Sequence, residues 1–181
     1  MYKRQDIANK EGGIVLGTGD LSEIALGWST FNGDHMSNYN VNCSIPKTLV
    51  KTLISYEKDN VKKEVSKELD NVLNTTISPE LLPEKNGKIQ DTEASIGSYI
   101  LNDFFLFHFI RNSFSLEKIE FLAKKTFAED FSEKEITKTL DMFINRFKRN
   151  QFKRSVMPPG VKIGTVSLSP RGDFRFPDEI D

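Results

Sequence analysis

The sequence predicts an α/β protein that keeps one or two strands and is otherwise mostly helical, and three observations lead to this class. A short apolar run at residues 14–16 is followed by the turn Gly17-Thr18-Gly19 and then by a helix-like pattern at residues 21–26. A strand that passes through a glycine turn into a helix is how α/β proteins present backbone N–H groups to anions. Between residues 60 and 147, apolar residues recur at helical spacing with charged residues on the other face.

Local signals place the helices in order along the chain. A glycine pair closes the first helix, Pro46 suits the first turn of another, and Ser115 is a candidate cap. Ser132 and Glu135 have the spacing of a capping box in front of an apolar helix face. With the apolar spacing, these signals predict helices at residues 1–12, 21–26, 46–56, 61–73, 99–111, 115–126 and 132–147.

The remaining stretches are expected to be loops and short strands. Residues 28–42 form a long polar loop rich in asparagine, and a loop of this length is more often functional than filler. Prolines and a glycine mark a second loop at residues 74–98. The apolar run at residues 14–16 predicts a short buried strand of a parallel sheet, and residues 161–166 are a candidate second strand.

The bulk composition limits the class of protein further. With 181 residues, 38% of them hydrophobic, the chain is long enough for one domain with its own core. The net charge of −1 gives no field that would attract nucleic acid or a membrane surface, and no apolar run approaches the roughly 20 residues of a bilayer span. The polar start is not a signal peptide, and the single cysteine, Cys43, fits a reducing compartment. We therefore expect a cytoplasmic protein.

Stretches near both ends of the chain carry a family resemblance. The run LGTGDLSEIALGWSTFNGDHMSNYNVN at residues 16–42 is followed by PKTL, and the far end contains FKRS at residues 152–155 and SPRGDFR at residues 169–175. Together they resemble the synthetase domain of glutamine-dependent NAD synthetases, with Phe174 where that family usually has tryptophan. The resemblance implies a C-terminal fragment of a Rossmann-like domain of the adenine nucleotide alpha hydrolase (N-type ATP pyrophosphatase) type. The implied parts are a nucleotide and deamido-NAD segment, a helical segment and an irregular tail, at residues 1–56, 57–150 and 151–181.

The resemblance also implies a reaction and its partners. In the family, ATP adenylates the nicotinate carboxylate of deamido-NAD with Mg²⁺ present, and ammonia then converts the acyl-adenylate into the amide of NAD. A nitrilase-like glutaminase domain supplies the ammonia from glutamine. That domain and the SGGxDS pyrophosphate loop are expected upstream of residue 1, so we expect this chain to be inactive alone. A homo-oligomer is expected for the full-length protein.

Thr18 and Glu23 are candidate site residues because they flank the start of the helix at residues 21–26. A threonine hydroxyl in such a turn can bond a phosphate or ribose, and a carboxylate one turn into the helix can hold Mg²⁺, which takes hard oxygen ligands. The plainer interpretation is a helix cap for Thr18 and a surface glutamate for Glu23. The resemblance favours ATP binding by Thr18 and a deamido-NAD and Mg²⁺ role for Glu23.

The segment Trp28-Ser29-Thr30-Phe31 combines two aromatic rings and two hydroxyls on a loop. Aromatic rings stack on pyridine or purine rings, and hydroxyls bond ribose or phosphate oxygens. Core packing is the commoner fate of a lone tryptophan. The resemblance implies that all four residues contact deamido-NAD, although Phe31 stands where the ammonia-dependent relatives have lysine, so packing is an alternative for it.

Three further positions are candidates. Lys47 begins a helix, where a cation is electrostatically disfavoured, and this indicates a phosphate or acidic partner unless the side chain is simply solvated. The resemblance implies ATP contacts for Lys47 and Thr76 and a deamido-NAD contact for Lys153. Lys153 belongs to a basic run with interleaved phenylalanines at residues 146–154, which is most often a solvated helix end and less often a nucleic-acid site.

Two functions of other classes remain open on the sequence alone. One is a non-catalytic helical binding or regulatory module that retains a nucleotide-site scaffold. The other is a nucleic-acid-binding domain that uses the basic run, which the net charge disfavours.

Overall fold

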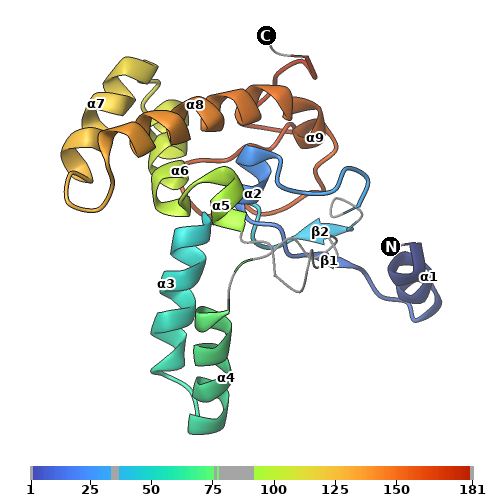
Figure 1. Ribbon diagram of the computed structural model, residues 1–181. Helices are drawn as coiled ribbons and strands as arrows, with labels where there is room; N and C mark the ends of the chain where they lie inside the picture. Colours follow the sequence, from blue (N-terminus) through green and yellow to red (C-terminus); the bar gives the residue numbers. More distant parts are fainter. Residues whose placement is uncertain (1, 34–36, 76, 78–91, 180–181) are drawn as a thin grey trace, which may run out of the picture.

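The computed structural model describes residues 2–33, 37–75, 77 and 92–179, as helices arranged around a core beside a small parallel sheet (Figure 1). The strands are β1 (Leu16–Gly17) and β2 (Tyr39–Asn40). The helices are α1 (Tyr2–Lys10), α2 (Leu21–Leu26), α3 (Lys47–Lys58), α4 (Lys63–Asn74), α5 (Thr92–Ile96), α6 (Tyr99–Leu106), α7 (Leu116–Thr126), α8 (Glu133–Arg149) and α9 (Gln151–Ser155), and α6 continues into a π-helical turn at Phe107–Arg111. None of the described helices combines the length and apolar character that crossing a bilayer requires.

The sheet confirms the parallel pairing and corrects the expected burial. β1 and β2 pair in parallel, with Leu16 opposite Tyr39. The predicted buried strand is wrong in one respect, because Ile14 and Leu16 are 63% and 56% exposed. Within the described part of the chain, β1 pairs only with β2, so the apolar run lacks the neighbouring strands and helices that would bury it.

The predicted strand at residues 161–166 is absent. This segment packs against residues 43–44. The Ser44 hydroxyl accepts the N–H of Ile163 at 2.9 Å, and Cys43 Sγ lies 3.6 Å from the carbonyl oxygen of Val161. Its backbone therefore forms hydrogen bonds with the side chains of Cys43 and Ser44, and it pairs with no strand of the described residues.

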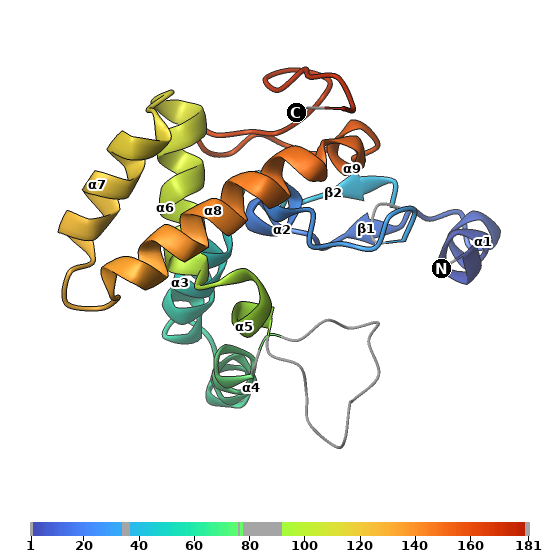
Figure 2. The same cartoon turned by 45° about the horizontal axis from the view of Figure 1, so that its top comes forward.

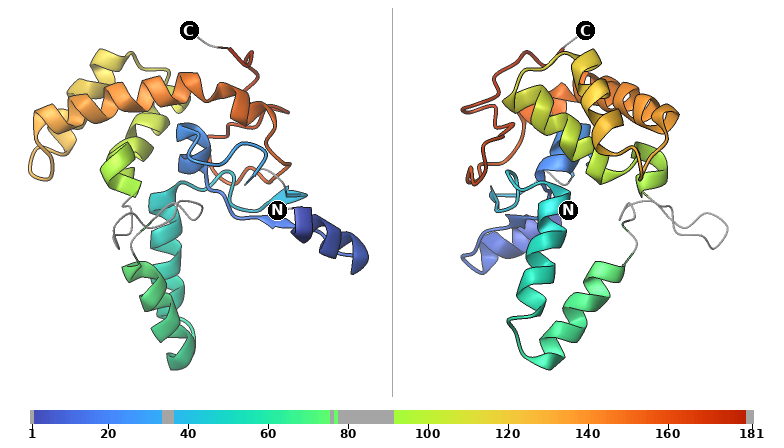
Figure 3. Two further views of the ribbon diagram at one scale, coloured as in Figure 1. Left: turned by 45° about the vertical axis from the view of Figure 1, so that its right-hand side comes forward. Right: turned by 90° about the vertical axis from the view of Figure 1, so that its left-hand side faces the viewer.

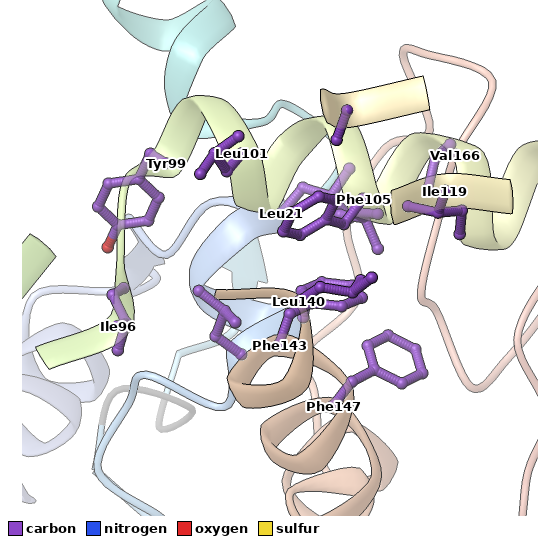
Figure 4. Close-up of a cluster of buried hydrophobic side chains, with 14 of the residues drawn as sticks. Leu21, Ile96, Tyr99, Leu101, Phe105, Ile119, Leu140, Phe143, Phe147 and Val166 are labelled. Atoms are coloured by element: carbon purple, nitrogen blue, oxygen red, sulfur yellow. The ribbon is translucent and has the colours of Figure 1, made fainter. Parts of the chain in front are cut away.

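The hydrophobic core joins the first, middle and last parts of the sequence. The long helix α8 crosses α6 and lies over α2 (Figure 2). The C-terminal tail runs behind α8 in the same view. Side chains from α2, α6, α7 and α8 converge in this core (Figure 4). Its fully or nearly fully buried members include Leu21, Leu26, Phe105, Ile119, Ile136, Phe143 and Leu168. Helix α2 is thus fixed by packing on its buried face, which positions both of its ends.

The helix predictions are largely confirmed. Ser115 and Ser132 cap α7 and α8 by accepting the backbone N–H of Lys118 and Glu135. Helices α3 and α4 form a hairpin that projects away from the core (Figure 3). Three short elements were not predicted: β2, inside the expected loop at residues 28–42, α5, inside the expected loop at residues 74–98, and α9, where an irregular tail was expected. All three are so short that their sequences carry no periodic signal.

Candidate functional site

The amino end of α2 is built by a reciprocal capping box. Asp20 Oδ1 accepts the N–H of Glu23 at 2.9 Å, and Glu23 Oε2 accepts the N–H of Asp20 at 3.1 Å. Asp20 is therefore the cap, and the interpretation of Thr18 as the cap is wrong. Thr18 is exposed in the turn before the helix. The capping box places two carboxylates at the positive end of the helix dipole.

Lys47 lies between these two carboxylates. Its Nζ is 2.6 Å from Asp20 Oδ2 and 2.7 Å from Glu23 Oε1, and 17% of its side chain is exposed. The same ammonium lies 5.6 Å from the ring centroid of buried Tyr99. The sequence predicted a phosphate or acidic partner for Lys47, and the structure contains the acidic one, so the interpretation of Lys47 as a solvated residue is wrong.

Burial and neighbouring charges shift all three groups. Burial raises the pKa of Asp20, against the pull of Lys47, and burial followed by repulsion from Asp20 raises the pKa of Glu23. Burial alone would lower the pKa of Lys47, but attraction to the two carboxylates raises it overall. One cation thus serves two carboxylates, and the cluster retains an affinity for further positive charge.

Asp103 of α6 connects this cluster to its supports. One carboxylate oxygen accepts the hydroxyl of Ser22, and the other accepts the N–H of Thr48 at 3.0 Å and its hydroxyl at 2.8 Å. The Ser22 hydroxyl in turn accepts the N–H of Lys47 at 2.8 Å. Asp103 therefore fixes the start of α3 against α2. Asp103 was not predicted from the sequence, although it is a single carboxylate inside the apolar run at residues 99–110.

The carboxyl end of α2 is bound by donors from α8, α9 and the residue between them. Arg154 Nη1 donates to the carbonyl of Ala25 at 3.0 Å. Arg146 Nε and Asn150 Nδ2 donate to the carbonyl of Leu26 at 3.0 and 3.3 Å. These side chains stabilise the negative end of the α2 dipole. The basic run is therefore not simply a solvated helix end, because Arg154 is 1% exposed.

Buried Arg154 keeps its charge without a carboxylate among the ion pairs of the described residues. Burial lowers its pKa to about 9, which leaves the guanidinium charged at neutral pH. It also donates to the side chain of Gln151 at 2.8 Å and to the carbonyl of Phe147, and it lies over the Phe147 ring at 4.1 Å. Carbonyl dipoles at the ends of two helices thus take the place of a counter-ion.

The loop after α2 contacts the same two helices. Lys153 Nζ donates to the carbonyls of Gly27 and Ser29 at 2.8 and 2.7 Å. The rings of Phe31 and Phe152 lie 5.2 Å apart. The structure therefore brings Lys153 to the segment 28–31, in which Trp28 and Ser29 are half-buried and Thr30 and Phe31 are exposed.

The candidate residues fall into two groups that α2 separates. Thr18, Glu23 and Lys47 lie at or before its amino end, whereas Lys153 and the segment 28–31 lie at its carboxyl end. A helix of six residues is about 9 Å long, so the two groups do not touch directly. Thr76 lies outside the described residues.

The carboxylates at the amino end have the donor chemistry that Mg²⁺ requires. Mg²⁺ takes hard oxygen ligands and usually combines one or two carboxylates with substrate phosphates. Asp20 and Glu23 fit that requirement, although both already contact Lys47. Among the described residues, there is no group of three or more His, Cys, Asp or Glu side chains that could bind a metal ion by itself.

The fold and the charged ends of α2 define the class of this protein as a Rossmann-like α/β protein with a candidate nucleotide site at a strand–glycine turn–helix unit. The sequence profile of the NAD synthase family matches residues 1–157. The chain therefore belongs to the NAD synthase family.

Curated relatives agree with this assignment. The chain is 44% identical over 195 residues to the glutamine-dependent NAD(+) synthetase of Mycobacterium bovis and 45% identical over 196 residues to that of Mycobacterium leprae. Each match includes 96% of this chain and 29% of the relative, so the chain spans less than a third of the length of these proteins.

A solved structure shares the fold. The crystal structure of a glutamine-dependent NAD(+) synthetase from Cytophaga hutchinsonii superposes with a TM-score of 0.72 over 97% of this chain and 26% of its own. Sequence identity in that superposition is 15%, so the similarity concerns the fold alone.

Proposed function

We propose that this chain is the C-terminal part of the synthetase domain of a glutamine-dependent NAD(+) synthetase. In the proposed reaction, ATP adenylates the nicotinate carboxylate of deamido-NAD and pyrophosphate leaves. Ammonia then attacks the acyl-adenylate, which forms the amide of NAD and releases AMP. The observation that carries the proposal is the NAD synthase match over residues 1–157.

The ATP side of the proposed site is the amino end of α2. Thr18 would bond ATP from the turn, Lys47 would bind its phosphates, and Thr76 would add a further contact. Lys47 is held by Asp20 and Glu23, so binding a phosphate requires the ammonium to exchange part of this contact. Glu23 would contact deamido-NAD and hold Mg²⁺, which when bound offsets the charge of the phosphates.

The deamido-NAD side is the carboxyl end of α2. Trp28, Ser29, Thr30 and Phe31 would contact the dinucleotide together with Lys153. The support is electrostatic, because Lys153, Arg146 and Arg154 bring positive charge beside this segment. An anionic dinucleotide is attracted by such a field.

The complete enzyme would require parts beyond this chain. We place a glutaminase domain that supplies ammonia, and the SGGxDS pyrophosphate loop, upstream of residue 1 in a cytoplasmic protein that forms a homo-oligomer. The chain contains no SGGxDS sequence. Because phosphoryl chemistry depends on a preorganised phosphate cradle, this chain alone should make no NAD.

The gene and an activity assay test the proposal together. The reading frame upstream of Met1 should encode SGGxDS and a nitrilase-like domain, and the full-length product should form NAD from deamido-NAD, ATP, Mg²⁺ and glutamine. The 181-residue chain, given ammonium in place of glutamine, should form none above a protein-free control. A start codon at Met1 preceded by a stop codon would contradict the proposal and favour the binding module.

A further inference from the structure

Arg146 of α8 makes two contacts at the carboxyl end of α2. Its Nε donates to the carbonyl of Leu26 at 3.0 Å, and its guanidinium carbon lies 4.8 Å from the ring centroid of Trp28. The side chain is half-buried, so water does not fully screen the attraction between the guanidinium and the indole ring. No motif in the sequence singled out this residue from its basic neighbours.

The hydrogen bond to Leu26 is redundant, whereas the contact with Trp28 is not. Asn150 Nδ2 also donates to the Leu26 carbonyl, at 3.3 Å, so that oxygen keeps a partner when Arg146 is removed. Within the described part of the chain, the guanidinium of Arg146 is the cation that lies over the Trp28 ring. The distinctive effect of Arg146 is therefore on the orientation of the indole.

The backbone around Trp28 is already fixed, which leaves the side chain as the adjustable part. Gly27 adopts a left-handed conformation with φ 59°, and its N–H and that of Trp28 bond back into α2. A Cβ at Gly27 would lie 2.2 Å from the Cβ of Asn150, so α8 packs directly on this turn. The indole packs against the hydrophobic core, and the planar guanidinium of Arg146 covers one of its faces and restricts its rotamer further.

We propose that Arg146 is a positioning residue that holds the indole of Trp28 in the orientation in which its exposed part meets the pyridine ring of deamido-NAD. The inference rests on the proposed function for the identity of the ligand. It concerns the side-chain orientation of Trp28, which can also be measured without any substrate.

Fluorescence of the chain tests the orientation directly, because Trp28 is its only tryptophan. We compare the unmodified chain with Arg146→Ala, Arg146→Lys and the matched control Arg149→Ala, which removes an exposed arginine one turn further along α8. Arg146→Ala should increase acrylamide quenching of Trp28 roughly twofold, because the stacked contact is lost. Arg146→Lys keeps the charge but not the planar group, so its quenching should lie between that of the unmodified chain and that of Arg146→Ala. The quenching of Arg149→Ala should match that of the unmodified chain. Equal quenching in all four proteins overturns the inference.

Kinetics of the full-length synthetase test the consequence for the substrate. Arg146→Ala should raise KM for deamido-NAD about five- to tenfold and leave KM for ATP within about twofold, because Trp28 and the ATP side lie at opposite ends of α2. Arg149→Ala should leave both unchanged. A purely structural role would raise both KM values together, and that result overturns the inference. If the unmodified full-length protein makes no NAD, the proposed function itself fails, and with it the assignment of the ligand. If the unmodified and Arg149→Ala enzymes are active and Arg146→Ala leaves KM for deamido-NAD unchanged, the inference about Arg146 is rejected while the proposed function stands.

Discussion

Asp103 joins three helices through a half-buried carboxylate, and its replacement separates the effect of its hydrogen bonds from the effect of its charge. It accepts the N–H and hydroxyl of Thr48 at 3.0 and 2.8 Å, and the hydroxyl of Ser22. Asp103→Ala leaves the Thr48 N–H without its acceptor and removes both hydroxyl contacts. Losing the acceptor of the part-buried Thr48 N–H together with both hydroxyl bonds should lower the free energy of unfolding by about 3 kcal/mol.

Asp103→Asn should be far milder at neutral pH. The amide oxygen can accept both bonds from Thr48, and the amide nitrogen can donate to the Ser22 hydroxyl oxygen. The contacts between the heavy atoms therefore persist, and only the hydroxyl proton of Ser22 loses its acceptor. The substitution also removes a charge that is largely withdrawn from water. Burial raises the pKa of Asp103 despite the hydrogen bonds from Ser22 and Thr48, which means that the ionised form is the disfavoured one. We therefore expect a loss below about 1 kcal/mol at pH 7.

The same pKa shift sets the sign of a pH dependence. A carboxyl whose pKa is higher in the folded than in the unfolded protein contributes stability that is present below its unfolded pKa, about 3.9, and lost as the pH rises through its folded pKa. As the pH rises from about 4, the wild-type chain should therefore lose stability relative to Asp103→Asn until Asp103 is fully ionised in the folded protein.

Urea and thermal unfolding followed by circular dichroism measure both effects. For a chain of this size, a loss of 3 kcal/mol lowers Tm by roughly 6–12 °C, which Asp103→Ala should show and Asp103→Asn should not. Equal losses for the two variants at pH 7 would mean that the charge itself stabilises the fold, and the reasoning from burial would be refuted.

The other predictions concern the two ends of α2. In the full-length protein, Glu23→Gln keeps the size of the side chain but removes its charge. The turnover rate should therefore fall at least about tenfold and depend less on Mg²⁺, while Tm changes little. An unchanged rate would make Glu23 a structural residue. Lys153→Ala should raise KM for deamido-NAD roughly tenfold, with KM for ATP nearly constant, because a charge-assisted contact is worth about 1.5–3 kcal/mol; equal changes in both constants would argue against the assignment. Arg154→Ala should lower the unfolding free energy of the chain by about 3 kcal/mol or more, whereas exposed Arg149→Ala should change it by less than about 0.5 kcal/mol; denaturant titration distinguishes them, and matching curves would contradict the account of Arg154.

Elements specified by neighbouring residues could be predicted from the sequence. Ser115 and Ser132 mark the starts of α7 and α8 because a cap acts on N–H groups within its own turn. Gly27 marks the end of α2 for the same local reason. The glycine turn into α2 and the parallel sheet followed from the order of apolar, glycine and helical residues.

Features that depend on distant residues could not be predicted. The burial expected for Ile14 requires neighbouring strands, and among the described residues β1 has only β2 beside it. Arg154 looked like a solvated cation because no local pattern shows that the carboxyl end of α2 lies against α9. Asp103 was overlooked because its partners, Ser22 and Thr48, are far from it in the sequence.

The two stretches that carried the family resemblance are far apart in the sequence, but they meet in the structure at helix α2. A helix of six residues is too short to be stable on its own, since isolated helices below about 12–15 residues are marginal in water. Its amino end is stabilised by Asp20 and by Lys47, and its carboxyl end by donors from the run at residues 146–154. The second stretch thus binds the backbone carbonyls of the first. One short helix therefore joins the two stretches, with the capping box and Lys47 at its amino end and the donors from residues 146–154 at its carboxyl end.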